Sequence, residues 1–103
     1  MRAGVAGLLV LSGGPAFAAE VSDADVLAIV QKHCVVCHAE KPAHENFQEA
    51  PSGIILETVN SLRTNAAAIY AQTVRTKAMP LGNQTGMTDQ ERNMLGAWLT
   101  RNP

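Results

Sequence analysis

Two cysteines and a histidine within five residues constrain this chain more than any other feature. The stretch Cys34-Val35-Val36-Cys37-His38 has the spacing C-x-x-C-H, and it holds both cysteines of the 103-residue chain. This spacing is typical of c-type haem attachment, in which the thiols bond to the haem vinyl groups and the adjacent imidazole ligates the iron. We therefore predict one covalent haem c, held by Cys34 and Cys37, with His38 as an axial iron ligand.

The same residues are compatible with other kinds of site. Two cysteines of an exported chain can form a disulfide, and C-x-x-C also occurs in thioredoxin-like redox proteins, although no βαβ pattern surrounds it here. A zinc site using Cys34, Cys37 and two of His33, His38 and His44 would lack the distant second ligand pair that zinc sites usually have. As rival iron ligands, His33 would point away from the iron and His44 follows His38 too closely to reach the opposite haem face.

The N-terminal residues have the pattern of a targeting segment. Arg2 precedes an apolar stretch over 3–11, and Ala16-Phe17-Ala18 follows a break that contains Gly and Pro. This pattern predicts a signal peptide over 1–18, export to the periplasm, and one mature domain over 19–103. An uncleaved membrane anchor is the alternative, although an interrupted apolar stretch of this length is marginal for crossing a bilayer.

The charge balance bears on the kind of partner. The chain has eight Lys and Arg against nine Asp and Glu, a formal net charge of −1. Such an even balance favours neither nucleic acid nor an anionic membrane surface. A mature part of about 85 residues buries only a modest core. A covalently bound apolar macrocycle would add both core volume and a cross-link, so we expect the haem to be part of the fold.

Two capping boxes predict the first and last helices. Ser22-Asp23-Ala24-Asp25 opens a helix over about 23–33 that leads straight into the cysteine motif, and Thr88-Asp89-Gln90-Glu91 opens a last helix over about 89–101. We expect these helices to cross and to pack through four apolar residues, namely Val26, Val30, Leu95 and Trp98.

The region between these helices is predicted to contain a loop and a helical stretch. Residues 39–53 have no sustained period and contain Pro and Gly, which favours an irregular loop around the haem edge. Within it, a backbone carbonyl close to Pro51 is expected to accept the Nδ1–H of His38. Residues 57–76 have apolar side chains at helical spacing, and they form either one helix or two short ones.

A methionine in a proline-containing loop is the predicted sixth iron ligand. Met79 lies in the stretch Lys77-Ala78-Met79-Pro80-Leu81-Gly82-Asn83. Its soft, neutral thioether would favour ferrous iron and raise the reduction potential relative to a second imidazole. Met87 is the second candidate for this position, whereas Met94 falls on the core face of the last helix.

The order of these features resembles class I cytochrome c over roughly 22–101. The resemblance implies a small all-α fold, with three to four helices wrapped around one covalent haem and with His38 and Met79 as axial ligands. It also implies one-electron transfer through an exposed haem edge. The sequence supplies no general base or open coordination site, so we do not expect an enzyme. The competing class is a five-coordinate ligand-binding or sensing haem protein, or a peroxidase-like enzyme, in which Met79 does not bind.

Two stretches, Cys34–Pro42 and Ala78–Thr88, are similar to the C-terminal cytochrome c domain of bacterial membrane-bound urate oxidases (urate hydroxylases). In that family an N-terminal membrane domain oxidises urate and the cytochrome domain carries the electrons away. The 103 residues contain no multi-helix membrane domain. The resemblance therefore implies an electron carrier with redox protein partners, among them a membrane-bound oxidoreductase, and it leaves a fragment of a fused urate oxidase as the alternative.

Overall fold

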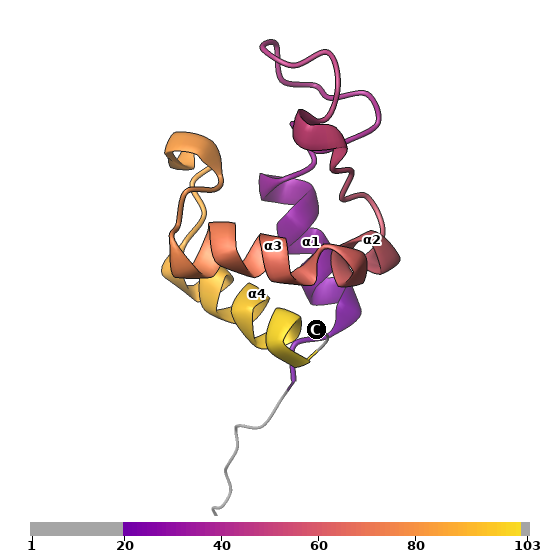
Figure 1. Ribbon diagram of the computed structural model, residues 1–103. Coiled ribbons are helices and arrows are strands. Elements are labelled where there is room, and N and C mark those ends of the chain that lie inside the picture. The colour runs from indigo at the N-terminus through magenta and orange to yellow at the C-terminus, as the bar shows by residue number, and fades with distance from the viewer. Residues whose placement is uncertain (1–19, 102–103) are drawn as a thin grey trace, which may run out of the picture.

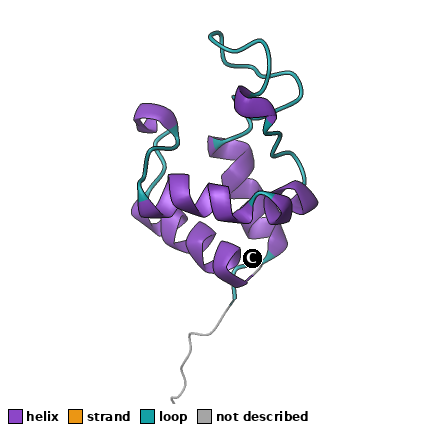
Figure 2. Ribbon diagram, viewed as in Figure 1, coloured by secondary structure: helices purple, strands orange, loops and turns teal. Residues whose placement is uncertain are grey.

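The computed structural model describes residues 20–101, which form helices joined by loops, without a β-strand (Figures 1 and 2). This part contains four α-helices, which are α1 (Asp23–His33), α2 (Val59–Thr64), α3 (Ala66–Tyr70) and α4 (Asp89–Arg101). Three short helical turns accompany them, which are η2 (Pro51–Gly53), η3 (Ala71–Arg75) and η4 (Leu81–Asn83). The predicted all-α architecture is confirmed for these residues. The predicted signal peptide over 1–18 lies outside them.

Both predicted capping boxes are present. The Ser22 hydroxyl accepts the Asp25 N–H at 3.0 Å, and the Asp25 carboxylate accepts the Ser22 N–H at 3.4 Å. At the start of α4, the Thr88 hydroxyl accepts the Glu91 N–H, and the Glu91 carboxylate accepts the Thr88 N–H, both at 3.0 Å. These bonds satisfy amide groups that a helix N-terminus leaves unpaired. From this cap α1 runs for 11 residues and ends at His33, directly before Cys34.

The predicted helical stretch over 57–76 folds as two short helices and a π-helical turn. The Thr58 hydroxyl accepts the Ser61 N–H at 3.1 Å and starts α2. At Asn65 the backbone leaves the helical region, and the side-chain amide of Asn65 donates to the Ser61 carbonyl at 2.9 Å. The Ser61 carbonyl also accepts the Asn65 backbone N–H at 3.1 Å, and after this break in the backbone α3 starts as a separate helix at the next residue.

The core lies where α1, α3 and α4 pack together. The four apolar residues predicted for the crossing of α1 and α4 are all fully buried in it, which confirms that contact: Val26, Val30, Leu95 and Trp98. Gly96 of α4 permits a close approach, because a Cβ at this position would lie 3.3 Å from Val74 and 3.7 Å from Tyr70. Tyr70 and Met94 pack against the same core.

Trp98 links the start of α1 to α4 and α2. Its indole Nε1–H donates to the Asp23 carboxylate at 2.9 Å, and the Arg63 guanidinium lies 5.7 Å from the ring centroid. Arg63 also pairs with Asp23, at 3.2 Å.

We expect Trp98→Phe to lower the free energy of unfolding by about 1–2 kcal/mol, since it keeps most of the buried ring and loses the bond to Asp23. Arg63→Gln should cost less than about 1 kcal/mol, because the Arg63 side chain and its ion pair with Asp23 are exposed and screened by solvent. Urea denaturation followed by far-UV circular dichroism measures both values. A larger loss in Arg63→Gln than in Trp98→Phe would contradict this ranking.

Two loops project on the same side of α3 (Figure 1). The loop that follows α1 runs to α2 and includes η2, and the loop between η3 and α4 includes η4. The irregular loop predicted over 39–53 is therefore confirmed, with one short turn inside it. Within residues 20–101, no helix has both the length and the apolar character that crossing a bilayer requires.

Candidate functional site

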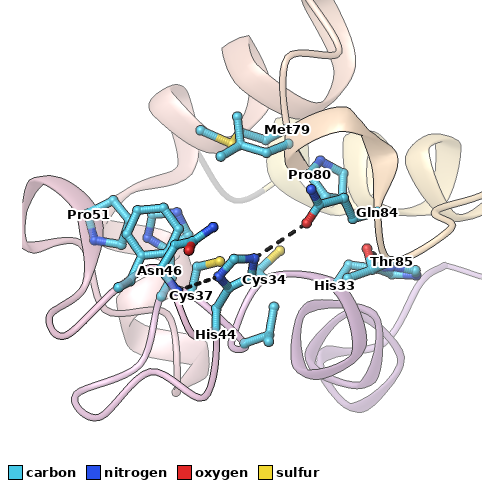
Figure 3. Close-up of a pocket in the computed structure, with 14 residues that line it drawn as sticks. His33, Cys34, Cys37, His44, Asn46, Pro51, Met79, Pro80, Gln84 and Thr85 are labelled. Atoms are coloured by element: carbon cyan, nitrogen blue, oxygen red, sulfur yellow. Dashed lines mark hydrogen bonds between the residues drawn. The ribbon is translucent and has the colours of Figure 1, made fainter.

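Two cavities meet at the C-x-x-C-H motif. One has a volume of about 330 Å³ and lies between the motif and the η4 loop, and the other has about 200 Å³ and lies between the motif and the α3–η3 region. Both have mostly apolar walls. Four residues line both cavities, namely Cys34, His38, Pro51 and Met79, and Cys37 lines the larger one. The structure thus brings together all four residues predicted to hold the cofactor. In Figure 3, Met79 lies across the larger cavity from the two cysteines.

The His38 ring is fixed by the backbone around it. Its Nδ1–H donates to the Ile54 carbonyl at 2.8 Å, and the His38 carbonyl accepts the Leu56 N–H at 2.9 Å. A carbonyl partner was predicted, but it belongs to Ile54, just beyond the predicted loop, rather than to a residue beside Pro51. Because Nδ1 carries the proton, Nε2 keeps its lone pair, and no described group hydrogen-bonds to it. This is the arrangement of a metal-binding histidine with its outer-shell partner.

The two cysteines lie on one backbone turn at the end of α1. The Cys34 carbonyl accepts the Cys37 and His38 N–H groups, at 3.1 and 2.8 Å, and both thiols are free. Burial, with a contribution from the Cys37 thiol, raises the pKa of the Cys34 thiol to about 11, and burial also raises the pKa of Cys37. Thioredoxin-like motifs instead lower the pKa of the attacking thiol. Residues 20–101 also lack the β-strands of the βαβ unit that accompanies such motifs, so neither the pKa directions nor the fold match a thioredoxin-like pair.

The zinc interpretation also lacks a geometric basis in the described part of the chain. Residues 20–101 contain no group of three His, Cys, Asp or Glu side chains placed to hold a metal ion. A structural zinc site needs four such ligands.

The two candidate methionines have different surroundings. The Met79 side chain borders both cavities, and its backbone N–H donates to the Gln72 carbonyl at 2.9 Å. Met87 is 4% exposed, belongs to the hydrophobic core and borders neither cavity. Its N–H and carbonyl are both bonded to the Asn83 side chain, at 2.9 and 3.2 Å. Of the two candidates, Met79, the predicted sixth ligand, borders the cavities, and Met87, the second candidate, does not.

His33 is a buried residue whose ring nitrogens both have protein partners. Its Nε2–H donates to the Glu91 carboxylate at 2.9 Å, and Nδ1 lies 2.8 Å from the Thr85 hydroxyl. The ring borders the larger cavity, but neither nitrogen is available to a metal ion. His33 therefore joins the end of α1 to the η4 loop and to the first turn of α4.

His44 spans the larger cavity from the opposite loop. Its Nδ1 accepts the Asn46 N–H at 3.1 Å, so the proton of the neutral ring is on Nε2, which lies 3.4 Å from the Gln84 side-chain oxygen (Figure 3). This contact connects the loop after α1 with the loop that carries Met79. Phe47 packs near the His44 ring and also borders the cavity.

The Glu91 carboxyl, which bonds to His33 beside the larger cavity, has a lowered pKa. The Thr88 N–H, together with the hydrogen bond from His33 and the charge of Lys32, lowers the pKa of the Glu91 carboxyl from 4.5 to about 2. A carboxyl whose pKa is lower in the folded state stabilises the fold above its unfolded pKa, and this contribution is lost as the pH falls through the folded value.

We expect the free energy of unfolding to fall between about pH 4.5 and about pH 2, by roughly 1–2 kcal/mol more than in Glu91→Gln, allowing for solvent screening. Urea titrations of both proteins at several pH values in this window provide the measurement. Parallel pH profiles for the two proteins would contradict the assignment to Glu91.

Arg92 is the residue near the site that sequence reasoning missed. It is 7% exposed, and its guanidinium bonds to the Thr73 and Met79 carbonyls at 2.6 and 2.9 Å. Its position in the sequence could have indicated that Arg92 is buried. It shares a helical face with Leu95 and Leu99, so it is a charged residue within an apolar stripe.

Comparisons of the chain with protein families, with curated proteins and with solved structures found no match. The function proposed below therefore depends on the residues and geometry of this chain.

Proposed function

We propose that this chain is a c-type cytochrome of class I fold, which carries single electrons through one haem. Cys34 and Cys37 would bond it covalently, and His38 and Met79 would be its axial ligands. One observation carries the proposal: the C-x-x-C-H motif and Met79, distant in sequence, border the same two cavities.

Three features of the site fit a haem. The cavity walls are mostly apolar, as a macrocycle requires, and the thiols that would form its thioether bonds are free and lie on one turn. The His38 Nε2 has its lone pair available, and a thioether lies across the larger cavity from the motif. When bound, haem supplies an iron centre that changes between ferric and ferrous states by one electron.

The residues of the chain would keep both ligands in place during electron transfer. The Ile54 carbonyl orients the His38 ring. Its hydrogen bond to Nδ1 also makes Nε2 a stronger electron-pair donor to a metal ion. The Met79 backbone is bonded at its N–H by Gln72 and at its carbonyl by Arg92. Ligands held in this way rearrange little when the iron changes charge, which favours outer-sphere transfer over catalysis.

The proposed location and partners follow from the N-terminal pattern and the resemblance. The protein would be a periplasmic carrier that exchanges electrons with redox proteins. Residues 1–18 would be either cleaved off or kept as a membrane anchor. A membrane-bound oxidoreductase, such as a urate-oxidising protein, is the proposed donor. We propose no nucleic-acid partner and no chemistry on urate by this chain.

The test is expression in a host that matures c-type haem, followed by intact mass and visible spectra. We expect one haem per chain, retained after denaturation, with slow and weak carbon monoxide binding to the reduced protein. The mass also shows whether residues 1–18 are removed. Absence of haem mass would overturn the proposal, and rapid stoichiometric carbon monoxide binding at neutral pH would instead support the five-coordinate class.

A further inference from the structure

Arg92 is a buried cation whose described partners are all neutral. Besides the two backbone carbonyls of Thr73 and Met79, its guanidinium contacts the Asn83 side-chain oxygen at 3.5 Å. None of the ion pairs found within residues 20–101 includes Arg92. Removing a guanidinium from water costs several kcal/mol, and here charge-assisted bonds to carbonyls offset that cost. The guanidinium therefore holds the Thr73 and Met79 carbonyls at fixed positions.

The three acceptors lie at successive points of the segment that presents Met79. Thr73 belongs to η3, the π-helical turn before the loop, and Asn83 ends η4, the turn after Met79. A π-helical turn departs from the α-helical bonding pattern, and Arg92 supplies a donor to one of its carbonyls. One planar group with fixed donor directions therefore sets the spacing between the end of η3 and the Met79 loop.

The Met79 backbone is consequently held from both sides. Its N–H donates to the Gln72 carbonyl at 2.9 Å, and its carbonyl accepts from Arg92 at 2.9 Å. With the main chain fixed at both polar groups, only side-chain rotation remains to place the sulfur. Asn83 also restrains this loop. Its side chain contacts Arg92 and forms two hydrogen bonds with the backbone of Met87, which precedes α4.

We propose that Arg92 is a positioning residue for the sixth iron ligand, and that it acts by fixing the Met79 backbone so that the thioether stays on the iron. This inference rests on the proposed cytochrome function. Loss of the guanidinium would leave the haem attached through Cys34 and Cys37 and ligated by His38, but the bond from Met79 to iron would open more often.

The experiment compares Arg92→Gln and Arg92→Lys with Arg75→Gln in the haem-bearing protein. Arg75 is an exposed arginine of η3 that borders neither cavity, so it is the matched control. The measurements are carbon monoxide affinity of the reduced form, the thioether-to-iron charge-transfer band of the oxidised form, the reduction potential, and far-UV circular dichroism.

In Arg92→Gln we expect roughly 10–100-fold tighter carbon monoxide binding, the usual effect range of an outer-shell partner, with a weaker charge-transfer band and a lower potential. The values for Arg92→Lys should fall between those of Arg92→Gln and the unchanged protein. Lysine keeps the positive charge but lacks the planar guanidinium that donates to two carbonyls at once. Arg75→Gln should match the unchanged protein in all four measurements.

Other outcomes would overturn the inference. One is attached haem in Arg92→Gln with carbon monoxide affinity and charge-transfer band unchanged. Another is loss of helical circular dichroism in both Arg92 variants, since this would make Arg92 a general folding residue. Absence of haem from the unchanged protein would instead overturn the proposed function itself, so the two failures are distinguishable.

Discussion

Replacing Cys34 and Cys37 together by alanine is expected to abolish covalent haem attachment and to destabilise the whole domain. The two cavities, of about 330 and 200 Å³, lie where the loop after α1, the η4 loop and the α3–η3 region meet. The packed core of α1, α3 and α4 does not fill this space. Without a cross-linked group there, both loops lose the surface against which they would pack.

The expected loss is large for a domain of this size. Removing a covalent cross-link from a small domain typically costs about 2–5 kcal/mol. Each kcal/mol lowers the melting temperature by about 4–8 °C, so we expect a fall of at least about 8 °C. Intact mass after denaturation measures attachment, and thermal circular dichroism measures stability.

The matched control for the double variant is Val36→Ala, which borders the larger cavity and leaves both thiols in place. It should keep the haem. A double cysteine variant with an unchanged melting temperature would show that the fold does not need the group, even if haem binds at the site.

Features encoded by adjacent residues could be predicted from the sequence. Ser22 with Asp25 and Thr88 with Glu91 are local capping pairs, so they indicated where α1 and α4 begin. A capping box depends on residues three apart, and tertiary packing changes it little. The same holds for the cysteine motif, whose spacing is itself the signal.

Features that depend on distant segments could not be predicted in this way. His33 bonds to Thr85 and Glu91, more than fifty residues further along the chain, and no local pattern indicates those partners. The carbonyl that accepts from His38 was predicted at the wrong residue, because its position depends on how the loop after α1 folds back. The burial of Arg92 likewise follows from the path of the Met79 loop, which local spacing does not describe.

The choice between the two methionines leads to the second large effect. Met79→Ala is expected to leave the haem attached and to open the sixth coordination position, because the Met79 side chain borders both cavities. Carbon monoxide should then bind the reduced protein rapidly and stoichiometrically. The reduction potential should fall on the order of 0.1–0.3 V, a fraction of the roughly 0.8 V range that axial ligands control.

Met87→Leu is the matched control, since it replaces a methionine of similar volume in the core. It should cost less than about 1.5 kcal/mol and leave the potential and the carbon monoxide affinity unchanged. The reverse pattern, with the large effect in Met87→Leu, would require the η4 loop to rearrange and to draw Met87 out of the core.

A different outcome would reject the electron carrier itself. If the unchanged protein already binds carbon monoxide rapidly, and Met79→Ala binds it no faster, then the iron has no methionine ligand. The site would then belong to a sensing or peroxidase-like haem protein rather than to an electron carrier.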